Sequence, residues 1–160
     1  MPVYKLDKLM EETRRLAAEY RASTGSTLPV STEIAKYDAM RLLDLKSPAN
    51  VERAVDAVRE CGADSQKIQI KARVLFNPEK SSYRVGQLNL DAHWDVTLLV
   101  ILNDQYVTEA IFELTRAQLD AEFAEADVMK KSARGAMSVN KFKAMASLVW
   151  HADSAEADGG

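Results

Sequence analysis

One segment of the chain places several chemically useful side chains on a single face of a strand. Residues 67–74 alternate between apolar and polar types, and the polar positions are Lys67, Gln69, Lys71 and Arg73. Successive side chains of a β-strand point to opposite faces of the sheet. The pattern therefore predicts one face in the core and one face that carries three cations around a glutamine. Such a face suits chemistry on a phosphate ester.

Hydrolysis of a phosphodiester requires a metal ion, an activated water and relief of developing negative charge. Asp56 is the expected metal-binding carboxylate, and Gln69 offers a side-chain carbonyl oxygen of the kind that Mg²⁺ prefers, with Mn²⁺ as a substitute. Lys71 lies two residues after Gln69, on the same face, and is expected to orient the water or stabilise the charge. Glu33 would complete the metal shell directly or through water.

Hydrophobic periodicity and capping signals predict the elements that must position these residues. In chain order they are helices over 4–22 and from Ser31 or Thr32, strands over 67–75, 95–102 and 106–114, a helix over 116–125, and a last helix that Ser138 caps and that reaches Val149. Glu33 falls in the first turn of the second helix, where its negative charge interacts favourably with the helix dipole. The strand over 95–102 is apolar on both faces and should be central.

The segment 46–60 has two readings. Ser47 and Pro48 would start a helix, and Val51, Val55 and Val58 are spaced as on one helical face. The alternative is a loop followed by a short strand over 54–58 and a turn at 61–64. Periodicity alone favours the helix.

A resemblance to a known family favours the strand. Asp56 followed by Gln69-x-Lys71, after a helix that bears Glu33, resembles the PD-(D/E)xK nuclease superfamily in its Mrr-like variant, which has glutamine in place of the second acid. The wider pattern also resembles a family of small bacterial nuclease-like proteins. The resemblance implies an α/β fold with a restriction-endonuclease-like core. A mixed central sheet of about four strands would be flanked by helices, with an N-terminal helical segment.

Composition sets further limits. The 160 residues suit one domain over 1–150, and the acidic residues 151–160 are expected to be a disordered tail. A single cysteine and two histidines leave too few of the usual ligands for a structural zinc site, and the cysteine count fits a reducing compartment. Neither a membrane span nor a signal peptide is expected, so a cytoplasmic protein is predicted.

These observations predict a small Mg²⁺-dependent endonuclease that acts on DNA, in bacterial defence or repair. Lys67 and Arg73 would approach the phosphate backbone, and a homodimer would be needed to cut both strands of a duplex. Two alternatives stay open. One is a catalytically inactive nuclease-like interaction module. The other is a helix-turn-helix regulator, in which residues 47–59 form the second helix; its acidic side chains suit a DNA groove poorly.

Overall fold

The computed structural model describes residues 3–77, 79, 83–125 and 137–153. Their elements, in chain order, are α1 (Val3–Thr24), α2 (Ser31–Leu42), β1 (Ala57–Cys61), β2 (Asp64–Val74), β3 (Arg84–Gly86), β4 (Val96–Leu102), β5 (Thr108–Thr115), α3 (Arg116–Glu125), β6 (Met137–Ser138), α4 (Val139–Met145) and β7 (Ser147–His151). The fold is therefore of the mixed α/β class, as predicted.

The main sheet has five strands in the order β1-β2-β4-β5-β7. Strands β2 and β4 run parallel, and the other neighbouring pairs are antiparallel. The expectation of about four strands was thus one too low. The additional strand is β7, which the periodicity assigned to the last helix. That helix ends at Met145, so Val149 lies on an exposed edge strand instead of facing the core.

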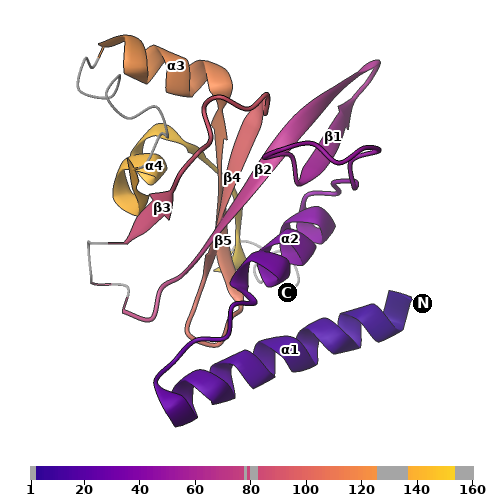
Figure 1. Ribbon diagram of the computed structural model, residues 1–160, viewed down its shortest axis with the longest axis vertical. Helices are drawn as coiled ribbons and strands as arrows, with labels where there is room; N and C mark the ends of the chain where they lie inside the picture. The colour runs from indigo at the N-terminus through magenta and orange to yellow at the C-terminus, as the bar shows by residue number, and fades with distance from the viewer. Residues whose placement is uncertain (1–2, 78, 80–82, 126–136, 154–160) are drawn as a thin grey trace.

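The sheet separates two layers of packing (Figure 1). On one face the apolar side chains of β2 and β4 pack against α2 and one side of α1, with Ile34, Ile68 and Leu98 fully buried. On the other face, α3, α4, β3 and the loop before β4 cover Leu99 and Ile101. Every residue of β4 is buried, which confirms its predicted central place.

The helical reading of residues 46–60 is wrong. Ser47–Arg59 contains no helix, and the segment instead pairs with its neighbours through the backbone. Lys46 and Val58 exchange hydrogen bonds of 2.9 and 2.8 Å, and the N–H of Asp56 donates to the Ile68 carbonyl at 2.8 Å. These non-local bonds outweigh the helical spacing of the valines. The helix-turn-helix alternative therefore loses its second helix, and the strand begins at Ala57, three residues later than expected.

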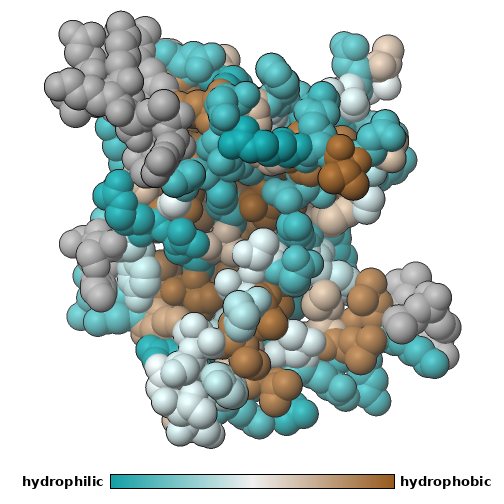
Figure 2. All heavy atoms as spheres, in the orientation of Figure 1, coloured by the Kyte–Doolittle hydropathy of each residue, from teal (hydrophilic) through white to brown (hydrophobic). Residues whose placement is uncertain are grey.

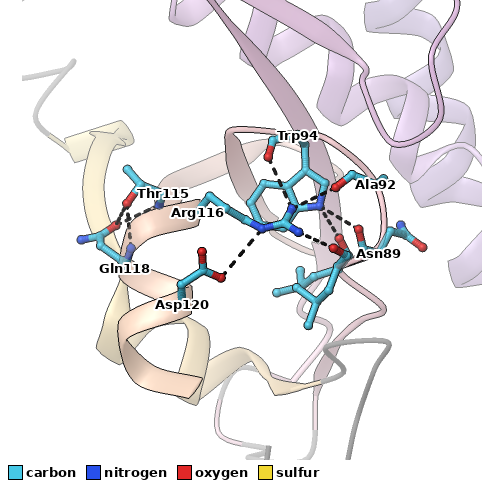
Figure 3. A network of polar contacts seen from close by, with 9 residues as sticks. Asn89, Ala92, Trp94, Thr115, Arg116, Gln118 and Asp120 are labelled. Carbon is cyan, nitrogen blue, oxygen red and sulfur yellow. Dashed lines mark hydrogen bonds and ion pairs between the residues drawn. The ribbon is translucent and has the colours of Figure 1, made fainter. Parts of the chain in front are cut away.

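A second cluster of contacts fixes the loop that leads into β4 (Figure 3). The Trp94 indole N–H donates to the Leu88 carbonyl at 2.6 Å, and the Arg116 guanidinium lies 4.5 Å from the ring centroid of Trp94. Arg116 also donates to the carbonyls of Leu90 and Ala92. One partly buried arginine thus bonds to several carbonyls of this loop.

Two expectations fall on residues whose placement the structure does not describe. Residues 130–135, whose basic side chains and glycine predict a loop, lie outside the described residues, and so do residues 154–160 of the predicted tail, whereas His151 is the last residue of β7. Within the described part of the chain, no helix combines the length and the apolar character needed to cross a membrane.

Candidate active site at the start of strand β1

Asp56 lies immediately before β1, at the edge of β2. Its backbone N–H bonds to Ile68, and its carboxylate atom Oδ2 accepts the N–H of Ile70 at 2.8 Å. The side chain therefore takes the place of a backbone acceptor where the β1–β2 ladder ends. This bond fixes the carboxylate beside β2, and the side chain keeps 22% of its exposure.

Lys71 lies on the opposite face of β2 from the core residue Ile70. Its in-register neighbour on β4 is Leu99, which belongs to the packing layer of α3 and α4. Burial lowers the pKa of Lys71 from its ordinary value, Asp56 raises it by a smaller amount, and Arg73 lowers it further. Among the described residues, Lys71 has no hydrogen-bond or ion-pair partner. It is thus a half-buried cation under the influence of a carboxylate.

Gln69 is bonded to the neighbouring strand β4. Its side chain is buried, and its Oε1 accepts a hydrogen bond from the Thr97 hydroxyl on β4 at 2.9 Å. Thr97 is the in-register neighbour of Gln69, so the contact runs across the sheet. The Gln69 oxygen, which was expected to bind metal, therefore already has a hydrogen-bond partner on β4.

Glu33 and Asp56 share a cation that the sequence analysis did not single out. Lys36, one helical turn after Glu33, places its Nζ 3.2 Å from Asp56 Oδ1 and 3.9 Å from Glu33 Oε1. The Glu33 side chain is 70% exposed, so it can change rotamer freely. The missed signal was the Glu33-x-x-Lys36 spacing, which puts both residues on one face of α2.

The two residues expected to contact the nucleic-acid backbone are engaged within the protein. Lys67 Nζ lies 2.8 and 3.0 Å from the two carboxylate oxygens of Glu52. Arg73 donates to the carbonyls of Ala72 and Arg84, and burial lowers its pKa. Gly86 on β3 has φ of +90°, which favours glycine, and a Cβ there would also lie 3.0 Å from a nitrogen of the Arg73 guanidinium. Arg73 holds β3 against β2 in this arrangement.

The donor set fits a weakly held Mg²⁺ ion better than a tightly caged one. Within the described residues, no three His, Cys, Asp or Glu side chains converge on one point. Mg²⁺ commonly keeps several waters and binds through one or two carboxylates plus substrate phosphates. Asp56 and Glu33 supply two carboxylates around one cation position, which the Lys36 ammonium fills. A metal ion there would be held by Asp56 and Glu33 once Lys36 has moved.

In comparisons with known proteins, the chain matches no family model and no curated protein sequence.

Proposed function

We propose that the protein is a small metal-dependent nuclease with a restriction-endonuclease-like core, acting on DNA. The observation that carries the proposal is the position of Lys71, a half-buried lysine without an ion-pair partner among the described residues, close to the edge carboxylate Asp56. Burying a cation without a bonded partner costs stability, and proteins retain such groups where their chemistry is needed. The order of helix, hairpin and central strand agrees with the family that the sequence resembles.

In this proposal each side chain has a defined task. Asp56 and Glu33 hold the ion, which would polarise the scissile phosphate and lower the pKa of an attacking water. Lys71, whose pKa the Asp56 charge raises, orients that water or stabilises the charge that develops on the phosphate oxygens. Gln69 fixes the strand through Thr97, and it reaches the ion only if this bond is broken.

Cleavage assays test the proposal directly. Single- and double-stranded DNA would be incubated with wild type and Lys71→Ala, each with Mg²⁺, with Mn²⁺ and with chelator. We expect metal-dependent cutting by wild type and a loss of about 10²–10³-fold in the variant, the usual effect of removing one transition-state donor. Lys46→Ala is the matched control, because Lys46 is an exposed lysine whose partner is Glu60, 3.1 Å away.

The catalytically inactive interaction module remains the second candidate, and one observation favours it. Both oxygens of Asp56 already have partners, Lys36 and the N–H of Ile70. A carboxylate satisfied in this way can serve the fold alone. Absence of metal-dependent cutting on every substrate would favour the module, and cutting that survives Lys71→Ala would point to a contaminating nuclease.

We also propose that the protein forms a homodimer through α1. Large apolar side chains lie exposed along this helix, and the space-filling view shows hydrophobic surface over it (Figure 2). They are Leu6, Leu9, Leu16 and Tyr20, with exposures of 40, 47, 56 and 39%. These side chains lie three, seven and four residues apart, with Thr13 at the intermediate position, which is the heptad pattern of a helix–helix seam.

The charges beside this seam select a second copy of the chain as the partner. Lys5 and Lys8 precede the central Glu12, and Arg15 and Glu19 follow it. In an antiparallel pair the N-terminal lysines of one helix meet Glu19 of the other, and Glu12 meets Arg15. A parallel pair would place like charges together. The helix is therefore complementary to an antiparallel copy of itself.

A further inference from the structure

The ammonium of Lys36 occupies the point where two carboxylates from different parts of the fold converge. Asp56 comes from the segment before β1 and Glu33 from the first turn of α2, yet both lie within 4 Å of the same nitrogen, at 3.2 and 3.9 Å. The Lys36 side chain keeps 32% of its exposure, so a path to solvent is open to it.

A divalent cation and this ammonium cannot share the position. Mg²⁺ requires oxygen ligands at about 2.0–2.1 Å, so both carboxylates would have to close on the ion. An ammonium left about 4 Å from that ion would be strongly repelled. Without any cation, the two carboxylates would repel one another instead. The site is therefore satisfied by one cation at a time.

We propose that Lys36 is a built-in competitor for the metal: its ammonium neutralises Asp56 and Glu33 in the metal-free protein, and a divalent ion binds by displacing it. This inference rests on the proposed metal site. Lys36 would then weaken metal binding. The observed affinity of wild type would be lower than the intrinsic affinity of the two carboxylates, because the lysine contacts must break before the ion binds. The lysine is a positioning residue here and has no role in the chemical step.

Metal binding without nucleic acid tests the inference. Free Mn²⁺ would be titrated by electron paramagnetic resonance against wild type, Lys36→Met and the control Lys46→Met. We expect Lys36→Met to bind Mn²⁺ about tenfold or more tightly than wild type, and Lys46→Met to bind as wild type does. Asp56→Asn should abolish binding in both the wild-type and the Lys36→Met backgrounds.

Thermal unfolding gives a second readout that does not depend on activity. Metal-free Lys36→Met should melt below wild type, because Asp56 and Glu33 lose their counter-ion, and saturating Mn²⁺ should remove this difference. Lys36→Gln provides a second neutral variant if the methionine protein is poorly folded.

The possible results separate the two proposals. Equal Mn²⁺ affinity in wild type and Lys36→Met, or weaker binding by the variant, would overturn the competitor role and leave the metal site standing. Absence of binding by both proteins would overturn the metal site itself, and with it the proposed function. Tighter binding that persists in the Lys36→Met, Asp56→Asn double variant would also overturn the inference, because the ion would then lie elsewhere.

Discussion

Burial of the Lys71 ammonium destabilises the folded state, and the direction of its pKa shift shows how this effect changes with pH. Burial lowers the pKa of Lys71 below its ordinary value of 10.5, so the folded chain releases this proton at lower pH than the unfolded chain does. Between the folded pKa and 10.5 the unfolded chain binds more protons, and stability rises with pH across that window. At pH values below this window, the buried ammonium destabilises the folded state to its full extent.

Replacement of Lys71 by methionine should therefore stabilise the protein while it removes activity. We expect Lys71→Met to have a higher Tm than wild type at pH 7, and the difference should shrink as the pH approaches the upper end of the window. Calorimetric scans between pH 7 and 10.5 would measure this trend. The Lys46→Met control should show no such convergence. A lower Tm for Lys71→Met at pH 7 would show that the lysine serves the fold.

The candidate site was predicted in part at the level of single residues. Sequence alternation placed Lys71 on the polar face of β2 correctly, because that alternation is a local property of the strand. The same alternation could not show that Gln69 turns to Thr97 or that Lys67 pairs with Glu52, since these partners are 28 and 15 residues away in the chain. Lys36 was missed for the same reason: its role depends on Asp56, which is brought to α2 only by the hairpin.

Among the elements, α1 is joined to the body by a buried polar contact. The Arg14 guanidinium donates to both carboxylate oxygens of Asp38 at 3.0 and 2.9 Å, and the Thr108 hydroxyl donates to Asp38 at 2.7 Å. Asp38 is almost fully buried on α2, and Thr108 lies on β5. One carboxylate therefore joins two helices to the sheet.

Removal of this carboxylate should be strongly destabilising. Asp38→Ala leaves the Arg14 charge without its partner, and we expect a loss of about 3–5 kcal/mol in the free energy of unfolding, measured with urea. Glu60→Ala is the control, because Glu60 pairs with Lys46 at 3.1 Å on the exposed surface, away from α1. That pair should be worth less than about 0.5 kcal/mol. A small effect of Asp38→Ala would mean that apolar packing and the hydrogen bond from Arg14 to the Tyr106 carbonyl are enough to hold α1.

The elements themselves were predictable where the pattern is long and the local signals agree. The helix over Arg116–Glu125 has the predicted bounds, and Ser138 caps α4 through its side-chain oxygen, which accepts the Lys141 N–H at 3.1 Å. In the segment 46–60 the apolar spacing is helical, and the strand that the family resemblance favoured forms instead, at Ala57–Cys61, because the backbone pairs with Lys46 and with β2. Strand β7 was missed for a similar reason, because it forms by pairing with the edge of β5.

At the scale of the whole molecule, the exposed seam of α1 predicts a dimer, and exchanging the charges across the seam should first weaken and then restore it. Light scattering after size-exclusion chromatography should report twice the mass of one chain for wild type and one chain for Leu9→Glu, which buries a charge in the seam. Lys8→Glu should weaken the dimer, because it faces Glu19 of the second copy. The double variant Lys8→Glu, Glu19→Lys should restore it. A monomeric wild type at about 0.1 mM would contradict the pairing.

The sequence alone determined the class of fold, the central buried strand and the residue types available for chemistry. These depend on local propensity, on alternation and on burial of long apolar runs, all of which act over a few neighbouring residues. Only the tertiary structure decided that Asp56 ends a hairpin ladder, that Lys36 pairs with it, and that Gln69 bonds to Thr97. These facts depend on pairing between distant segments, in which backbone hydrogen bonds and ion pairs across the sheet outweigh the local preference of any one stretch.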